Sequence, residues 1–460
     1  MNYFSTRNTK LNLSFKKIFF KGLSEDGGLF LPNQIPKLSD KELKIFEKYN
    51  FQQMSFEIFK YFIGDTFNDN ELKKIIDTAY SKFREPNIID VKILDHISYV
   101  QLHHGPTLAF KDIAMQVLGG MYELLLKSEN IKINLVTATS GDTGAAAIDA
   151  IKDKKNVNIF VLHPHNKISS VQRQLMTTCN AENVFNIAIK GSFDDCQKIV
   201  KDMFVDQDFA NKINMSGVNS INWARIIAQI VYYFFIYYKF NNSKKPIVVS
   251  VPTGNFGDIY AGYVAKQMGL NIKELIVATN QNNILQRCID TGEYKPLDVA
   301  ESISPSMDIQ VASNFERILF YLCNENAEDL KKLMNDLKTK GYFKLSKKQL
   351  ENLRDHFSAS SCSEDETLKI IQNIHKKFDY LIDPHTATGV KPLLDQKYKR
   401  EECFCFETAH PSKFPAAILK AINLKPELPE NLKLNVNQEE KFIILDNNLE
   451  VIKEYISNKI

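Results

Sequence analysis

Cysteine is scarce in this sequence, and its pattern excludes a small protein held together by disulfides. The 460 residues include seven cysteines, an odd number, which are scattered along the chain and form no CxxC pair. Cys403 and Cys405 lie two apart on a predicted strand and so share a face, but they are too near in sequence for an unstrained bridge. Unpaired thiols indicate a reduced environment, and we expect a cytoplasmic location.

Strong charge and long apolar runs are also missing. A net charge of +3 over 460 residues is close to neutral, and no basic stripe carries interleaved aromatic residues, so we expect no nucleic-acid partner. The most apolar stretch, 226–240, contains Gln229 and is too short to span a bilayer, which predicts a buried helix and no membrane partner. Residues 1–17 lack an apolar core followed by small residues, so we expect no secretory signal.

Closely spaced histidines do not meet the requirements of a metal site. His103 and His104 are adjacent, so at most one of them faces a given side of a strand. His163 and His165 flank a strand end without further ligands at metal-binding spacing. We therefore expect no metal ion, and a position beside a ligand pocket is the alternative for His104.

What the sequence does contain is an alternation of strands and helices. With 44% hydrophobic and 25% charged residues, the chain has the composition of a globular protein of two or three domains. The alternation from residue 88 onward predicts an α/β fold of mostly parallel sheets flanked by helices, in which ligands bind beyond the carboxyl ends of strands. We predict strands at 91–93, 100–103, 131–137, 157–162, 184–189, 247–251, 274–279, 380–382 and 403–406.

Three parts are predicted along the chain. They are an N-terminal cap domain at 1–95, a first α/β part at 96–245 and a second α/β part at 246–460. We also predict helices at 40–62, 70–83 and 112–126, a polar helical insertion near 325–378, and a closing strand and helix within 442–455.

The segment 104–112, HGPTLAFKD, places Lys111 at the mouth of a helix just after a turn. An ammonium at a helix N-terminus faces the positive end of the macrodipole, and burial disfavours its charge further. Such a lysine can be a neutral amine that forms a Schiff base with pyridoxal phosphate. The alternative is a solvated lysine in a first helical turn.

The loop ATSGDTGAAA, 138–147, follows the buried-type strand 131–137. Its glycines let the backbone approach a ligand, and the hydroxyls of Thr139, Ser140 and Thr143 lie at the start of a helix. This arrangement suits an anion such as a carboxylate. The alternative is a plain N-capping turn.

A second loop, PTGNFGD at 252–258, follows the strand 247–251 and precedes a helix. Gly254 and Gly257 bracket a tight turn whose amides can surround a phosphate beside a helix dipole. The loop has neither the GK[ST] ending of a nucleotide triphosphate site nor the pattern GxGxxG. A turn without a ligand is the alternative.

Six motifs together resemble the threonine synthase family, in its branch with an extended N-terminal portion. They are HHGPTLAFKD, TATSGDTGAAA, NSINWAR, VPTGNFGDIYAGY, SPSMDIQVASNFER and ETAHPSKF, and the likeness extends over 22–414. This family is similar in fold to the tryptophan synthase β-subunit group, which implies two α/β domains with pyridoxal phosphate between them and a small N-terminal domain.

The resemblance implies that Lys111 is the catalytic residue and carries pyridoxal 5'-phosphate as a Schiff base. Thr408 is expected to meet the pyridine nitrogen of the cofactor, and Ser412 is the alternative. The residues expected to hold the cofactor phosphate are Gly254, Asn255, Phe256, Gly257 and Asp258.

The loop 140–143 would face the substrate carboxylate and the ring hydroxyl of the cofactor. Asp142 is assigned to the cofactor, although the wider group usually has Asn here and a carboxylate would repel an anionic ring oxygen. Arg225 is the first candidate for the substrate phosphate, because a guanidinium fork matches phosphate, and Lys413 is the second. The substrate-binding residues implied are Ser140, Gly141, Thr143, Arg225 and Lys413.

The implied reaction converts the small molecule O-phosphohomoserine and water to L-threonine and phosphate, the last step of threonine biosynthesis. Two rivals remain: a phospholyase or dehydratase that releases a 2-oxo acid, and a protein that keeps the sheet for binding and carries no cofactor. We expect a monomer or a homodimer.

Overall fold

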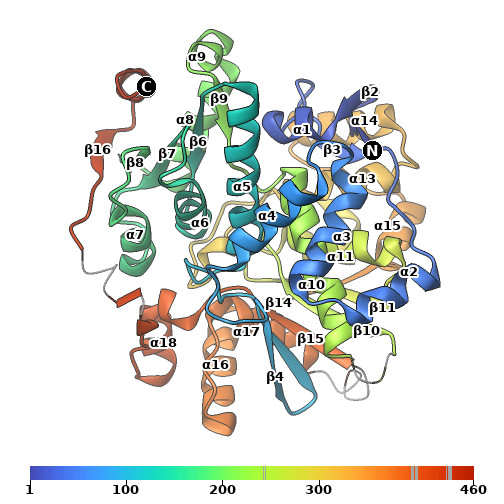
Figure 1. Ribbon diagram of the computed structural model, residues 1–460. Helices are drawn as coiled ribbons and strands as arrows, with labels where there is room; N and C mark the ends of the chain where they lie inside the picture. Colours follow the sequence, from blue (N-terminus) through green and yellow to red (C-terminus); the bar gives the residue numbers. More distant parts are fainter. Residues whose placement is uncertain (242, 244, 395–397, 399–401, 431, 434–437) are drawn as a thin grey trace.

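Two β-sheets form the centre of the molecule in the computed structural model, which describes all residues except 242, 244, 395–397, 399–401, 431 and 434–437 (Figure 1). The six-stranded sheet has the order β14 (Phe357–Ser361), β11 (Ile272–Thr279), β10 (Ile247–Pro252), β15 (Glu402–Glu407), β5 (Ile97–Gln101) and β4 (Asp90–Leu94). Only β4 runs antiparallel to its neighbour. The second sheet is parallel throughout, with the order β16 (Ile443–Asp446), β8 (Val184–Lys190), β7 (Val157–Pro164), β6 (Ile133–Ala138) and β9 (Met215–Gly217).

Helices cover both faces of these sheets. Every residue of β7 and of β10 is buried, as expected for central parallel strands. The five-stranded sheet packs against α5 (Lys111–Glu129), α6 (Asp142–Ile151) and α8 (Phe193–Val205). The six-stranded sheet packs against α10 (Trp223–Lys239), α11 (Gly257–Met268), α12 (Ile284–Thr291) and α17 (Pro384–Leu393).

The N-terminal residues form a cap against α5 and α10. It comprises the antiparallel strands β1 (Asn2–Ser5), β2 (Asn8–Ser14) and β3 (Phe30–Pro32), and the helices α1 (Phe15–Lys21), α2 (Asp40–Ile45), η1 (Phe46–Lys48), α3 (Phe51–Ile63) and α4 (Asp69–Tyr80). α3 packs on α10, where the rings of Phe51 and Phe235 are 5.2 Å apart, and α4 packs on α5.

The remaining elements join the sheets or lie at the surface. They are α7 (Ser170–Thr177), α9 (Gln207–Lys212), β12 (Glu293–Tyr294), η2 (Pro305–Met307), α13 (Phe315–Leu322), α14 (Ala327–Lys340), β13 (Phe343–Lys344), α15 (Lys347–Arg354), α16 (Glu364–Phe378), η4 (Pro411–Lys413), α18 (Pro415–Ile422) and α20 (Leu449–Ser457). No helix in the described part of the chain is both long and apolar enough to cross a membrane.

The α/β fold class is confirmed, with two local differences. The strand predicted at 380–382 is wrong, because the chain there leads into the N-cap of α17, where the Asp383 carboxylate accepts the amides of His385 and Thr386. The polar segment 325–378 contains the expected helices, but it also contributes β14, an edge strand whose sequence FSASS is too poor in apolar residues to be recognised.

The chain crosses between the two sheets near its catalytic candidate. β5 lies in the six-stranded sheet, whereas α5, ten residues further on, packs against β7 of the other sheet. Lys111 is the first residue of α5 and therefore lies at the junction between the two halves. Close to the C-terminus, β16 returns to the five-stranded sheet and pairs with β8.

Candidate active site

Lys111 is held at the junction by backbone contacts of the two residues that precede it. The Phe110 amide donates to the Thr408 carbonyl at 2.9 Å, and Ala109 and Ala409 form an isolated β-bridge. The Lys111 side chain is 12% exposed and lines a cavity of about 500 Å³. Burial lowers the pKa of this amine below its ordinary value, while the Asp142 carboxylate opposes that shift. The neutral amine expected from the sequence therefore agrees with its environment.

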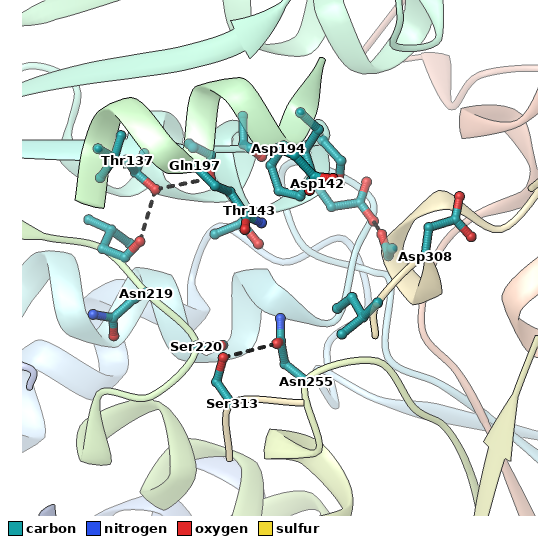
Figure 2. Close-up of a pocket in the computed structure, with 18 of the residues that line it drawn as sticks. Thr137, Asp142, Thr143, Asp194, Gln197, Asn219, Ser220, Asn255, Asp308 and Ser313 are labelled. Carbon is teal, nitrogen blue, oxygen red and sulfur yellow. Dashed lines mark hydrogen bonds between the residues drawn. The ribbon is translucent and has the colours of Figure 1, made fainter. Parts of the chain in front are cut away.

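Polar side chains from both halves of the molecule line this cavity (Figure 2). Loops after β6 and β10 meet here, as expected for the carboxyl ends of parallel strands. Of the predicted site residues, the cavity is lined by Lys111, Ser140, Asp142, Thr143 and Asn255. Polar lining residues that the prediction did not assign include Thr137, Asp194, Gln197, Asn219, Ser220, Ser306, Asp308 and Ser313.

The loop between β6 and α6 presents hydroxyls at a helix N-terminus. Its own turn is closed by Thr139, whose Oγ1 accepts the amides of Gly141 at 3.0 Å and of Gly144 at 2.9 Å. Gly141 has a φ of 131°, and a Cβ there would meet Gln172 at 2.9 Å, so glycine is required. Ser140 and Thr143 remain at the cavity wall, where they and the helix N-terminus suit a carboxylate.

The loop between β10 and α11 is pressed against the segment 304–314. Asn314 donates to the Asn255 carbonyl through its backbone amide at 3.1 Å and through its side chain at 3.0 Å. Phe256 takes the left-handed conformation, with a φ of 65°, and its ring packs into the core against Phe315 and Phe357. The first amides of α11 have no partner within the helix and point toward this loop, as an anion site requires.

Adding a methyl group to the phosphate loop should weaken cofactor binding. A Cβ at Gly254 would lie 2.6 Å from the Ser306 carbonyl oxygen, so the Gly254→Ala variant must move the loop. We expect the resulting strain, about 1–3 kcal/mol, to raise the Kd for pyridoxal phosphate roughly tenfold or more. Equilibrium dialysis measures this, and Gly341→Ala is the control: its φ of 79° makes it strained, but it has open space and no part in the site. An unchanged Kd for Gly254→Ala would contradict the assignment.

Asp258 directs its carboxyl group away from the loop and into the core. Tyr232 and Tyr233 donate to its Oδ1 at 2.6 Å and 3.2 Å, and Oδ2 has no hydrogen-bond partner among the described residues. Burial raises the pKa of this carboxyl to about 7, and the two tyrosine hydroxyls oppose the shift. Asp258 can therefore contribute to an anion site through its backbone amide, with its side chain supporting the turn from behind.

The raised pKa of Asp258 predicts a pH dependence of stability. Between the usual value of 3.8 and about 7, the unfolded chain has released a proton that the folded protein retains, so stability falls as pH rises through this window. The free energy of unfolding of the Asp258→Asn variant should therefore fall less than that of the wild type between about pH 5 and about pH 8, by on the order of 2 kcal/mol. Denaturant unfolding at both pH values measures this. A decline equal to that of the wild type would show that Asp258 does not titrate in this range.

Arg225 is a buried cation, and two of its guanidinium nitrogens lack a hydrogen-bond partner among the described residues. Its side chain lies at the start of α10 and is 3% exposed, and its Nε and Nη1 have no hydrogen-bond partner among the described residues. Burial lowers the pKa of the guanidinium to about 10, so it stays charged at neutral pH. Its charge also lowers the pKa of Lys111, which places it near that amine. Like Lys413, Arg225 is not among the described residues that line the cavity, but its guanidinium, with two unpaired nitrogens and close enough to lower the pKa of Lys111, is suited to an anionic ligand.

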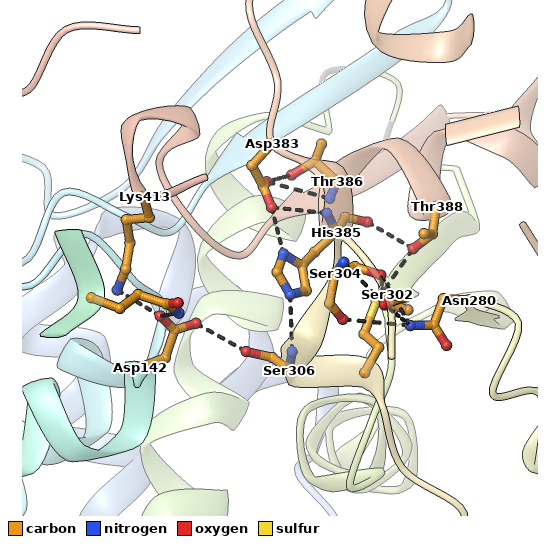
Figure 3. A network of polar contacts seen from close by, with 12 residues as sticks. Asp142, Asn280, Ser302, Ser304, Ser306, Asp383, His385, Thr386, Thr388 and Lys413 are labelled. Carbon is orange, nitrogen blue, oxygen red and sulfur yellow. Dashed lines mark hydrogen bonds and ion pairs between the residues drawn. The ribbon is translucent and has the colours of Figure 1, made fainter. Parts of the chain in front are cut away.

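The other two predicted residues differ in what they face. Thr408 is bound through its carbonyl to Phe110, which places it beside Lys111, whereas the Ser412 hydroxyl is occupied by His410 Nδ1 at 2.7 Å. This favours Thr408 over Ser412 at the cofactor ring. Lys413 is 0% exposed and lies outside the cavity lining formed by the described residues, behind Asp142 (Figure 3). The predicted contact between Lys413 and a substrate phosphate stays a prediction, and the position of Lys413 outside the cavity lining does not favour it.

Two motifs contained site residues that the sequence did not single out. Asn219 and Ser220, at the cavity wall, belong to the segment NSINWAR, from which only Arg225 was chosen for its charge. Ser306 and Asp308 belong to SPSMDIQVASNFER, whose neutral and acidic residues gave no chemical signal by themselves. In the fold all four residues line the cavity, and the Ser306 hydroxyl donates to Asp142.

The residues at the cavity fit pyridoxal phosphate. A buried amine of lowered pKa can hold its aldehyde, and the amides at the start of α11 can hold its phosphate. The Thr408 carbonyl accepts the amide of Phe110, the residue before Lys111, so Thr408 is close in the fold to that amine. The unpaired guanidinium of Arg225 offers a second anion site. No group of three or more metal-ligating residues occurs in the part of the chain that the structure describes.

Comparisons with known proteins match all parts of the chain. The family models "Threonine synthase N terminus", "Pyridoxal-phosphate dependent enzyme" and "Threonine synthase, C-terminal" match residues 2–80, 97–403 and 386–456. The chain is 39% identical to threonine synthase of Pseudomonas aeruginosa, with 99% of this chain and 98% of that protein covered. It is similar to the crystal structure of pyridoxal-phosphate-bound threonine synthase from Brucella melitensis, with a TM-score of 0.96, 40% identity and coverage of 100% and 99%. The yeast threonine synthase structure gives a TM-score of 0.94 at 37% identity, covering 100% and 98%.

Proposed function

This chain belongs to the threonine synthase family, and from that premise we propose that it converts O-phosphohomoserine and water into L-threonine and phosphate with pyridoxal 5'-phosphate as cofactor. One observation carries the proposal: a buried lysine of lowered pKa lines one cavity together with residues of two anion-binding loops. The reaction breaks the bond between the γ-carbon and the phosphate oxygen. Water supplies the hydroxyl group that appears on the β-carbon.

The cofactor is assigned to the junction between the halves. Lys111 would hold its aldehyde, and the amides of Gly254 to Asp258 would surround its phosphate at the start of α11. Thr408 would meet the ring nitrogen, and as a neutral hydroxyl it would leave that nitrogen unprotonated. Pyridoxal phosphate supplies an electron sink that stabilises negative charge on substrate carbon.

Lys111 is proposed to move protons as well as to bind. Its lowered pKa favours the neutral amine, which can accept the proton from the substrate α-carbon once its nitrogen is free, and can return it when threonine forms. With only 12% of its side chain exposed, its protonated form is poorly solvated and therefore disfavoured. The same group therefore serves as anchor, base and acid.

Two anion sites are proposed to orient the substrate. Ser140, Gly141 and Thr143 would receive its carboxylate at the start of α6, and the Arg225 guanidinium would receive its phosphate. Asn219 and Ser220 line the cavity just before α10 and add polar contacts near that phosphate. Fixing both ends of the substrate selects a chain with a phosphate on its γ-carbon.

Product analysis tests the proposed function. Purified protein loaded with pyridoxal phosphate is incubated with O-phosphohomoserine, and threonine, 2-oxobutyrate and phosphate are quantified. We expect one threonine for each phosphate released. Phosphate accompanied by 2-oxobutyrate would instead identify a lyase that releases its product before water is added.

The organisation of the enzyme is part of the proposal. We divide the chain into the cap 1–95 and the α/β parts 96–245 and 246–460. β5, from the first α/β part, lies in the six-stranded sheet, and β16, from the second, lies in the five-stranded sheet. All seven cysteines are free thiols, which supports a cytoplasmic location. We propose that the protein acts as a monomer or a homodimer.

A further inference from the structure

Asp142 lies at the centre of a set of polar contacts that joins three parts of the chain (Figure 3). Its Oδ1 accepts from Lys413 at 2.7 Å and from Gln172 at 2.9 Å. Its Oδ2 accepts from the Ser306 hydroxyl at 3.1 Å and lies 3.4 Å from the Lys111 amine. The carboxylate is thus bound on both oxygens and stands next to the amine that would hold the cofactor.

Lys413 is committed to this carboxylate. Its side chain is 0% exposed, and its amine donates to Asp142 and to the Thr107 carbonyl at 2.8 Å. A buried lysine is stable as a cation only when it is paired and hydrogen-bonded, and both conditions are met here. Lys413 and Asp142 therefore form a pair with no net charge.

Lys111 cannot take over this role. Its nitrogen is engaged by the aldehyde and exchanges protons with the substrate during the proposed reaction, so its charge changes through the cycle. Asp142 needs a cation whose charge does not change, because an unpaired buried carboxylate would either take up a proton or repel an anionic ring oxygen. Among the described residues, Lys111 and Lys413 both contact Asp142, but Lys413 does not line the cavity and so keeps away from the reacting groups.

We propose that Lys413 is a positioning residue: it neutralises Asp142 from behind, so that an ionised aspartate stands beside the cofactor ring with the local charge of a neutral amide. The proposal rests on the proposed function. It assigns Lys413 to the cofactor side of the site, where the sequence had suggested the substrate phosphate. It also explains how this chain has Asp at a position where Asn is usual in the wider group.

A double-mutant cycle separates this role from a merely structural one. The variants are Lys413→Met, Asp142→Asn and the double variant Lys413→Met/Asp142→Asn, each loaded with pyridoxal phosphate. The first readout is the pH midpoint at which the visible absorbance of the bound cofactor changes. The other ionisable groups close enough to act on Asp142, Lys413 or Lys111 are the same in every variant; they include Asp112, Arg225, Asp258, His385 and His410.

Opposite shifts are expected from the two single variants. Lys413→Met leaves extra negative charge near the Lys111 nitrogen and raises the midpoint. Asp142→Asn leaves extra positive charge and lowers it. The double variant returns close to the wild-type midpoint and regains at least part of the kcat that Lys413→Met loses. Lys391→Met is the control, because its pair with Glu366 is partly exposed and has no contact with Asp142, and it leaves the midpoint unchanged.

The melting temperature of the protein without cofactor gives an independent readout. Each single variant should melt several degrees lower, since it removes the 2.7 Å ion pair between two buried groups, and the double variant should recover. The proposal is overturned if both single variants shift the midpoint in the same direction, or if the double variant recovers neither the midpoint nor the melting temperature. Neither the absorbance midpoint nor the melting temperature requires O-phosphohomoserine, so these two readouts can support the pair even if the wild type makes no threonine, and refute it even if it does.

Discussion

The Lys111→Ala variant is expected to form threonine at least about 10³-fold more slowly than the wild type, since it loses both the cofactor attachment and a proton-transfer group. The Lys111 amine lines the cavity 3.4 Å from Asp142 Oδ2, and burial lowers its pKa. Alanine at the first residue of α5 should leave the helix intact, because alanine is a strong helix former.

Initial rates of phosphate release and threonine formation measure this loss. Lys16→Ala is the matched control, because Lys16 is an exposed lysine bound to Glu129 at the other end of α5. We expect the control to keep the wild-type rate. Wild-type turnover by Lys111→Ala would refute the proposed mechanism.

The Arg225→Met variant is expected to lose activity and gain stability. Removing a buried partner of a charged group costs about 2–5 kcal/mol, so kcat/KM for O-phosphohomoserine should fall roughly 10²-fold or more. In the protein without ligand the guanidinium is buried and its Nε and Nη1 are unpaired in the described structure. Replacing it with an apolar side chain of similar length should therefore raise the free energy of unfolding by about 1–3 kcal/mol.

Arg317→Met is the matched control for this prediction. Arg317 is also fully buried, but its guanidinium donates to the carbonyls of Phe30 and Ile221 and to the Asn314 side chain. Its loss leaves those acceptors unsatisfied and should lower the free energy of unfolding. Denaturant unfolding without ligand and steady-state kinetics measure the two effects. If Arg225→Met is destabilised like Arg317→Met, then Arg225 is a structural residue and its assignment to an anion fails.

The two loops of the site could be predicted because their signals are local. A strand, a turn with glycines and a helix follow one another within about fifteen residues at both 131–147 and 247–258, and parallel strands bring their carboxyl ends to one edge. Lys111 was found in the same way, from the turn that precedes its helix. Their meeting in one cavity does not follow from these local signals, because β6 and β10 belong to different sheets; it was implied by the family resemblance, which places the cofactor between two α/β domains.

Lys413 and Ser306 could not be placed from the sequence. Lys413 follows His410 and Pro411, where the sequence is equally compatible with a phosphate ligand. Only the fold, in which η4 packs on α7 and α18, brings the Lys413 amine to Asp142 at the start of α6. Ser306 reaches Asp142 from a turn 164 residues away along the chain. β14 was missed for a related reason, since its small polar residues become a strand only by pairing with β11.

Borohydride trapping tests the central claim most directly. The protein is incubated with pyridoxal phosphate, reduced with sodium borohydride, digested and mapped by mass spectrometry. The account predicts that the phosphopyridoxyl group is found on Lys111 and that Lys111→Ala carries none. Modification of a different lysine, or no modification of the wild type, would contradict it.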